Sequence, residues 1–434
     1  MKRISSILLI AALLAGFATV SQARDDDRSH ILKIYNWADY IDEDLLDEFQ
    51  VWYREQTGEE IEIIYQLYDI NEVMLTKIET GHEDYDVVCP SEYIIERMLR
   101  NDLLLPISHD FGSTPDYTEN VSPFFKKLIN EFSAGGRKGE DYAVPYMWGT
   151  TGLLYNTEFV SDEEASTWAS IWNPRFQGRI LMKDAFRDVY GSMMMYVRKG
   201  EIESGSATRS QVMNDLSDKY LKIFEDTMAA AKNNITGWEV DFGKERMAQG
   251  KDWINVTWSG DAMWAIEEVS DLVDLKYSVP DEGSNIWFDG WVIPKYAKNV
   301  KAASYFINFM CISESALRNM DEIGYVSAIS TPEILDEKID EECPVIDLSY
   351  FFGPDADSVC VNSVQYPDAK TIERCALMHD SGDRAEAMVD MWSRVKGDSL
   401  NAVAIISIGI VIVAVVIFTI MARRKKKSHH KSRR

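Results

Sequence analysis

The sequence is poor in the residues that most often hold metals or carry redox chemistry. Its 434 residues include five cysteines and six histidines. The cysteines show no CxxC spacing and the histidines form no HExxH motif, so zinc-binding, thioredoxin-like and metalloprotease chemistry find no support. The sequence also lacks a phosphate-binding loop and a nucleophile motif. We therefore expect no metal, no cofactor and no enzymatic activity.

The cysteines still carry limited information. Cys89 lies in an apolar run, where it is expected to be a small buried hydrophobic residue. One disulfide among Cys343, Cys360 and Cys375 is compatible with an oxidising compartment, and its pairing stays open.

Basic residues are scarce outside the two ends of the chain. The sequence has 45 Lys and Arg against 71 Asp and Glu. Without the two basic residues of the first segment and the eight of the last, 35 basic residues remain against 71 acidic ones, a charge near −36. So acidic a surface excludes nucleic acid as a partner. It would concentrate a cationic ligand, although an acidic, soluble exterior explains the charge equally well.

Both ends of the chain predict contact with a membrane. Lys2 and Arg3 precede an apolar run over residues 4–20 and the small residues around Ala23, which indicates a signal peptide over 1–23. Residues 402–422 are 21 uncharged residues, about the length that crosses a bilayer. A basic tail over 423–434 follows and obeys the positive-inside rule. We expect an outer domain, one membrane span and a short cytoplasmic tail that contacts anionic lipid.

Between these ends, the chain alternates strands and helices. The first third predicts strands and helices in turn, at residues 31–36, 43–56, 60–67, 71–80, 85–90 and 93–101. Strands separated by helices of this length indicate βαβ units and a mainly parallel sheet, hence an α/β fold. Short strand-like segments at 143–149, 153–156, 180–182 and 254–258 open a second set.

After residue 280, the pattern of the first set returns. We therefore predict two lobes joined by a hinge, the first over 24–144 and 281–330 and the second over 145–280 and 331–398. Ligands of such sheets bind at the carboxyl ends of the strands.

Four short segments pair aromatic residues with a carboxylate. They are Trp37-Ala38-Asp39-Tyr40, Ser91-Glu92-Tyr93, Trp258-Ser259-Gly260-Asp261 and Trp287-Phe288-Asp289. Each aromatic residue alone is more typical of a packed core. Because all four segments lie at or just after predicted strand ends, together they indicate a cage for an organic cation, held by aromatic faces and charge-assisted hydrogen bonds.

Longer motifs resemble those of the spermidine/putrescine-binding proteins of bacterial ABC importers. They lie at residues 34–40, 85–91, 145–152, 184–190 and 322–325. The resemblance runs from about residue 32 to 325 and more weakly to 397. It implies a two-lobed periplasmic binding protein fold of type II-like architecture, here with one C-terminal transmembrane helix.

The resemblance also implies the ligand-binding residues. In the first lobe these are Trp37, Tyr40, Ser91 and Tyr93; Asp188 supplies an acidic contact, followed by Trp258 and Asp261 of the second lobe, and Trp287, Asp289 and Tyr325 complete the cage. Ala38 replaces a hydroxyl residue common in the family, which removes one hydrogen bond. Residues 377–380 show no match to a late polar contact of some spermidine binders, and Asp261 favours a diamine.

The expected function is that of a monomeric, membrane-tethered receptor outside the cytoplasm, in the periplasmic space, that delivers putrescine or spermidine to an ABC permease. Lobe closure would exclude water from the cation–π contacts and paired charges. A saccharide receptor is the alternative, disfavoured because several acids and no Lys or Arg are expected near the ligand. A glycoside hydrolase using Asp188 and Asp289 is a weaker alternative, and a tail without an output domain disfavours an inward-signalling sensor.

Overall fold

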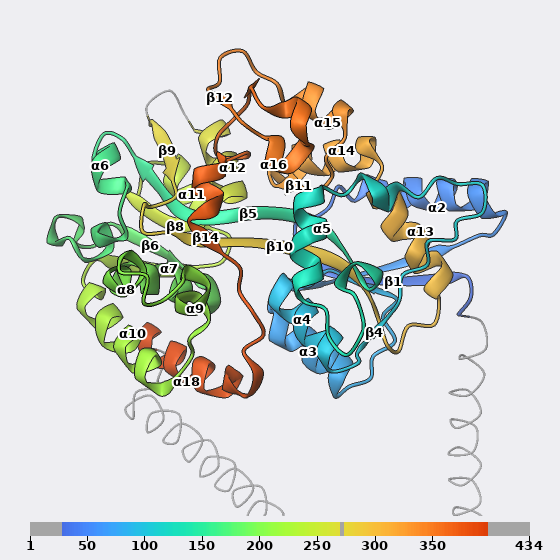
Figure 1. Ribbon diagram of the computed structural model, residues 1–434, viewed down its shortest axis with the longest axis horizontal. Helices are drawn as coiled ribbons and strands as arrows, with labels where there is room; N and C mark the ends of the chain where they lie inside the picture. Colours follow the sequence, from blue (N-terminus) through green and yellow to red (C-terminus); the bar gives the residue numbers. More distant parts are fainter. Residues whose placement is uncertain (1–27, 270–272, 398–434) are drawn as a thin grey trace, which may run out of the picture. The chain divides into compact units, whose positions relative to one another are not determined.

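The computed structural model describes residues 28–269 and 273–397 (Figure 1). The predicted signal peptide (1–23), membrane span (402–422) and tail (423–434) lie outside these ranges. Among the helices that are described, none combines the length and apolar character needed to span a bilayer. The described residues form two compact units, one of residues 28–215 with 233–382 and one of residues 216–232 with 383–397.

The smaller unit is a helix pair. Helix α10 (Asp218–Ala231) and helix α18 (Ala385–Lys396) pack through Phe224 and Trp392, whose ring centroids lie 6.4 Å apart. Arg394 adds an ion pair to Glu225 at 3.2 Å.

A twelve-stranded sheet organises the larger unit. Its strands are β1 (Ile31–Trp37), β2 (Glu62–Tyr68), β3 (Val87–Val88), β4 (Leu104–Leu105), β5 (Ala143–Asn156), β6 (Ile180–Lys183), β7 (Ile235–Glu239), β8 (Ile254–Trp258), β9 (Leu275–Ser278), β10 (Ser284–Pro294), β11 (Val326–Ser327) and β14 (Cys375–Ala376). The main order is β2-β1-β3-β10-β5-β8-β6-β7. A separate small sheet pairs β12 (Val345–Ile346) with β13 (Val359–Cys360).

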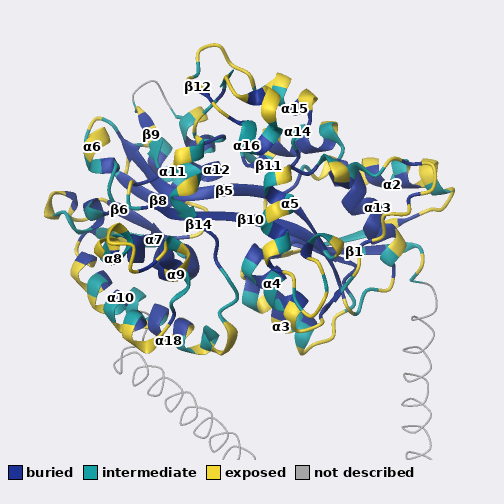
Figure 2. Ribbon diagram, in the orientation of Figure 1, coloured by how far each residue is buried: buried dark blue, intermediate teal, exposed yellow. Residues whose placement is uncertain are grey.

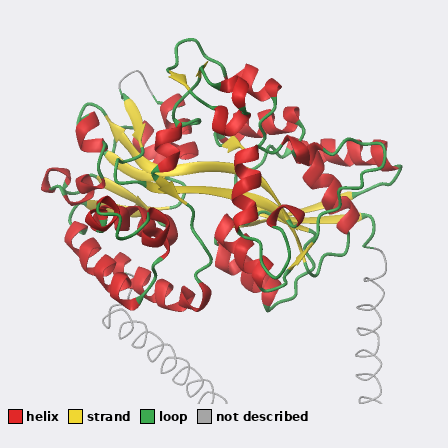
Figure 3. Cartoon of the chain, in the orientation of Figure 1, coloured by secondary structure: helices red, strands yellow, loops and turns green. Residues whose placement is uncertain are grey.

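Helices lie around these strands (Figure 3). Those of the larger unit are α2 (Asp44–Thr57), α3 (Asn71–Glu79), α4 (Glu92–Arg100), α5 (Pro123–Glu131), α6 (Asp162–Ala165), α7 (Phe186–Val197), α8 (Lys199–Glu203), α9 (Arg209–Asn214), α11 (Gly243–Ala248), α12 (Ser259–Glu267), α13 (Val300–Met310), α14 (Ser313–Ile323), α15 (Pro332–Lys338), α16 (Ser349–Phe352) and α17 (Ala369–Glu373). The strands and helices predicted in the first third of the chain are all present, with shifts of a few residues at their ends.

The sheet is mixed, which corrects the prediction of a mainly parallel one. β1 pairs in parallel with β2 and β3, and β6 pairs in parallel with β7 and β8, as the βαβ pattern predicted. The centre is antiparallel, because β10 pairs in that sense with both β3 and β5, and β5 with β8. Every residue of β5 and β10 is buried (Figure 2).

The two-lobed α/β fold that we predicted is thus present, with β10 and β5 at the centre of the main strand order. The predicted bounds of the two lobes stay a prediction. The prediction divided β5 into two short segments around Gly149 and Gly152, although the strand is continuous. A Cβ on Gly149 would approach the Ser259 hydroxyl to 2.5 Å and the Trp287 ring to 2.8 Å. Glycine therefore permits close packing at this position and does not interrupt the strand.

All five cysteines lie in the described ranges and are free thiols there, so the structure forms no disulfide among Cys343, Cys360 and Cys375. Cys89 is fully buried, as expected.

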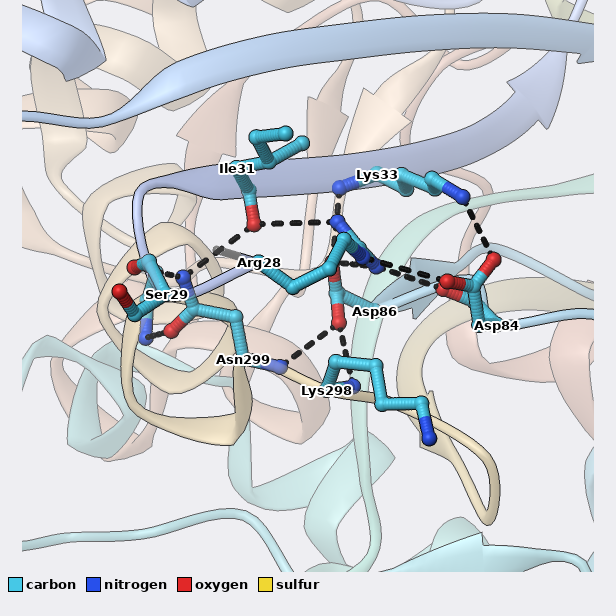
Figure 4. Close-up of polar contacts among 9 residues, drawn as sticks. Arg28, Ser29, Ile31, Lys33, Asp84, Asp86, Lys298 and Asn299 are labelled. Carbon is cyan, nitrogen blue, oxygen red and sulfur yellow. Dashed lines mark hydrogen bonds and ion pairs between the residues drawn. The ribbon is translucent and has the colours of Figure 1, made fainter. Parts of the chain in front are cut away.

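A buried aspartate joins the start of the chain to a late loop (Figure 4). Asp86 directly precedes β3 and is inaccessible to solvent. Its Oδ2 accepts hydrogen bonds from the Lys33 backbone at 2.9 Å and the Arg28 guanidinium at 3.0 Å. Its Oδ1 accepts from the backbone N–H groups of Lys298 and Asn299, both at 2.8 Å. One carboxylate therefore connects β1, β3 and the loop that precedes α13.

We expect Asp86→Ala to lower the free energy of unfolding by about 3 kcal/mol, because four donors lose one buried acceptor. Urea denaturation of the purified protein measures this. The matched control is Asp336→Ala at an exposed position of α15, which should change stability by less than about 0.5 kcal/mol. Equal effects of the two variants would contradict the structural role of Asp86.

Candidate functional site

Asp289 lies at an irregularity in the β5–β10 ladder, where the register shifts between Phe288 and Gly290. Its Oδ1 accepts a hydrogen bond from the Ser91 hydroxyl at 2.6 Å, and its Oδ2 accepts one from the Tyr40 hydroxyl at 2.8 Å. Burial raises the pKa of Asp289 to about 7, although the two hydroxyls act to lower it. The carboxylate is thus removed from water, and among the described residues only neutral hydroxyl groups donate hydrogen bonds to it.

The first-lobe residues form a polar frame around Ser91. Asn71 at the start of α3 donates from its amide to the hydroxyls of Ser91, at 3.0 Å, and Tyr93, at 3.1 Å. Trp37 ends β1 and donates its indole N–H to the Cys89 carbonyl at 2.9 Å. These bonds set the positions of Ser91, Tyr93 and Trp37 relative to Asp289.

Asp188 occupies the first turn of α7, directly after β6. Its Oδ1 accepts three hydrogen bonds, from the Asn285 amide at 2.9 Å, the Trp258 indole at 3.1 Å and the Thr151 hydroxyl at 3.3 Å. Burial raises the pKa of Asp188, and these donors act in the opposite direction. In the described part of the chain, no Lys or Arg forms an ion pair with Asp188 or Asp289.

Asp261, in the first turn of α12, differs because it has a cation. Its Oδ1 accepts from the Tyr325 hydroxyl at 2.8 Å, and its Oδ2 accepts from the Lys183 ammonium at 2.5 Å. The expectation that no Lys or Arg lies near the site is therefore wrong. Burial acts to lower the pKa of Lys183, but the charges of Asp261 and Glu239 outweigh it, so the pKa is raised.

Aromatic rings connect these carboxylates. The Tyr325 ring contacts the rings of Tyr40 and Trp287, with both centroid distances 5.5 Å. Trp287 in turn contacts Trp258 at 6.3 Å. All these contacts are steeply inclined, the edge-to-face geometry that aromatic pairs prefer. The rings form a continuous apolar wall that reaches Asp289 through Tyr40 and Asp188 through Trp258.

The structure brings all ten predicted residues together. Eight are joined by direct hydrogen bonds or ring contacts: Tyr40, Ser91, Asp188, Trp258, Asp261, Trp287, Asp289 and Tyr325. Trp37 and Tyr93 join them through Cys89 and Asn71.

Four neighbours of these residues were not predicted, namely Asn71, Lys183, Arg187 and Asn285. Glu92 is the carboxylate of the predicted segment Ser91-Glu92-Tyr93, but it was not among the ten ligand-binding residues. Both carboxyl oxygens of Glu92 are buried without a hydrogen-bond partner among the described residues. Burial raises the pKa of the Glu92 carboxyl group well above its usual range. For Lys183 the available signal was its position, because it directly follows the apolar residues 180–182 and directly precedes the motif at 184–190.

This arrangement is suited to binding a cation. A positive charge near Asp289 or Asp188 would replace the water that burial removed, in a region where electrostatic attraction is stronger than in bulk solvent. The adjacent ring faces would add cation–π attraction.

A model of the family of bacterial extracellular solute-binding proteins matches residues 45–341. The chain belongs to this family. Membership makes it a solute-binding receptor and not an enzyme, and it sets aside the glycoside-hydrolase alternative.

Individual solute-binding proteins are similar to this chain over most of their length. The spermidine/putrescine-binding periplasmic protein of Salmonella typhimurium is 27% identical over 397 residues, which cover 91% of this chain and 99% of the relative. A putrescine-binding periplasmic protein of Pseudomonas aeruginosa is 27% identical and covers 76% of this chain and 87% of its own length. The structure of the substrate-binding protein of a spermidine/putrescine ABC transporter from Streptococcus pneumoniae matches with a TM-score of 0.62 and 31% identity, over 85% of this chain and 99% of that one.

We expect the carboxyl group of Asp289 to titrate near pH 7 in the ligand-free protein. The folded state then holds this proton more tightly than the unfolded chain, where the pKa is about 3.9, so Asp289 destabilises the fold increasingly as pH rises from about 4 to about 7. Relative to wild type, Asp289→Asn should gain stability over this range, approaching about 4 kcal/mol at pH 8. Carbon-13 NMR of labelled aspartate and urea denaturation at several pH values measure both effects. A carboxyl signal that titrates near pH 4 would contradict this prediction.

Proposed function

We propose that this protein is an extracytoplasmic receptor that binds a linear polyamine of the putrescine or spermidine type and delivers it to an ABC permease. The observation that carries the proposal is the burial of Asp289 between the hydroxyls of Tyr40 and Ser91, with aromatic rings beside it and no cationic side chain paired to it in the described ranges. The similarity to spermidine/putrescine-binding and putrescine-binding proteins supports the same ligand class.

In this proposal, one ammonium group of the ligand binds at Asp289 and another at Asp188. Trp37 and Tyr40 pack against the methylene groups near the first ammonium, with Ser91 and Tyr93 beside them. The rings of Trp258, Trp287 and Tyr325 cover the methylene groups of the ligand between its two ammonium groups. Asp261 adds a polar group beside these rings. Methylene groups gain from burial against these rings, while each ammonium gains a carboxylate and a ring face.

A neutral saccharide suits the site less well. It also stacks on tryptophan, but it brings no positive charge to the desolvated carboxylates of Asp188 and Asp289. With a saccharide bound, each carboxylate would either stay ionised without a positive charge beside it or hold a proton. Both states cost free energy, and a diammonium ligand avoids this cost by pairing with the two carboxylates.

Transport needs only capture and release at the membrane. Burial of the ligand between two lobes allows closure to couple occupancy to permease recognition, because the closed state is stabilised by the ligand's contacts with both lobes. The predicted helix over 402–422 would keep a single receptor molecule near its permease, in place of diffusion through the periplasmic space.

Calorimetric titration of the full-length protein in detergent tests the ligand class. We expect putrescine or spermidine to bind and maltose to give no heat. Asp289→Asn should weaken polyamine binding at least about 30-fold, because one buried charge pair is lost. The exposed Asp336→Asn change should leave the affinity within about twofold. A wild-type protein that binds maltose and neither polyamine would refute the proposal.

Polyamine affinity should depend on pH through Asp289. An ammonium ligand requires the ionised carboxylate, so below pH 7 binding must first release a proton. With a pKa of about 7, the apparent Kd for putrescine should rise roughly 25-fold between pH 7.5 and 5.5. Titrations in buffers of different ionisation enthalpy count the released proton. The Asp289→Asn variant should lose this dependence, and a wild-type Kd that stays constant over the same range would contradict the assignment.

A further inference from the structure

Lys183 is a lysine buried within the site. It is the last residue of β6, and its side chain is 1% exposed. Its ammonium donates to Asp261 Oδ2 at 2.5 Å and to the backbone carbonyl of Val240, and lies 3.4 Å from Glu239 Oε1. The same ammonium lies 4.0 Å from the centroid of the Trp258 ring.

These contacts are the ones that a ligand ammonium would need. A carboxylate, an aromatic face and a carbonyl oxygen surround one positive charge, and the lysine side chain is itself a butyl chain that ends in an ammonium. The group is integrated into the wall, because Asp261 also bonds Tyr325 and the Trp258 indole N–H bonds Asp188. Lys183 therefore resembles one end of a diamine held permanently in the site.

Asp188, Asp261 and Asp289 therefore differ in the groups that bind to their carboxylates. Asp188 and Asp289 accept hydrogen bonds only from neutral groups among the described residues, whereas Asp261 already has its cation. A ligand ammonium could bind at Asp261 only by displacing Lys183, which would leave a buried ammonium with one carboxylate fewer. Such an uncompensated buried charge is strongly unfavourable.

We propose that Lys183 determines ligand specificity: its ammonium occupies the position at Asp261 and Trp258 that a third ligand ammonium would require, so the site prefers a diamine to a triamine. This inference rests on the proposed polyamine-binding function and specifies the ligand within it. Asp188 and Asp289 form no ion pair among the described residues, although the buried Arg187 guanidinium attracts the Asp188 carboxylate. These two carboxylates then match the two charges of the diamine.

The test compares the ratio of putrescine to spermidine affinity in full-length variants. In wild type, putrescine should bind more tightly. Lys183→Met removes the ammonium and retains most of the side-chain stem, so Asp261 becomes available and the ratio should shift toward spermidine by about tenfold or more. The double variant Lys183→Met with Asp261→Asn removes both charges and should abolish that shift. Lys183→Arg, which retains a cation, should retain the preference for putrescine.

The control is Lys370→Met, the same substitution at an exposed position of α17, which should leave the ratio unchanged. Circular dichroism and Tm establish that each variant is folded. An unchanged ratio in folded Lys183→Met protein would overturn the inference while leaving the polyamine receptor intact. Wild-type protein that binds neither polyamine would instead overturn the proposed function, and the inference with it.

If Lys183→Met does not fold, Asp261→Asn alone supplies a second measurement. Because the proposal assigns Asp261 to Lys183 and not to the ligand, this change should weaken putrescine binding less than Asp289→Asn does. An equal or greater loss would show that the ligand contacts Asp261 directly, and would overturn the inference.

Discussion

The site depends on the removal of Asp289 from water without an internal counter-charge. Two neutral hydroxyls from Ser91 and Tyr40 recover part of the lost hydration, and the remainder stays as a raised pKa. The cost is local, while the long, fully buried strands β5 and β10 keep the carboxylate in place. A receptor built this way uses the stability of its central strands to hold an acidic side chain in an environment that disfavours its charge. A bound cation would lower the free energy of that buried charge.

Lys183 shows how the same chemistry can be used in two ways within one group of neighbouring residues. An ammonium supplied by the chain forms an ion pair with Asp261, whereas Asp188 and Asp289 form no ion pair among the described residues. In the proposal, this difference separates the carboxylate that Lys183 occupies from those that the ligand binds. Local sequence does not reveal it, because each of the three acids lies within two or three residues of an aromatic residue.

Much of the first lobe could be predicted from the sequence, because regular hydrophobic periods and short loops determine it. The predicted strand at 31–36 and helix at 43–56 correspond to Ile31–Trp37 and Asp44–Thr57. The central antiparallel ladder could not be predicted, since Gly149 and Gly152 suggested breaks and the partner strand is more than a hundred residues away. The ten residues proposed for the site came from short aromatic and acidic motifs together with the family resemblance, and the structure places them near one another. Lys183 was missed because its partners, Glu239 and Asp261, follow 56 and 78 residues later, and a lysine at a strand end normally reaches solvent.

The hydrogen bonds around Asp86 also affect when the fold can form during synthesis of the chain. They join residues near 30 to residues near 299, and β10 must enter between β3 and β5 before the central sheet closes. During synthesis the first lobe therefore keeps open strand edges until about two thirds of the polypeptide has been made. The pairing of β3 with β10 joins residues about two hundred positions apart, and such distant pairings favour slow folding.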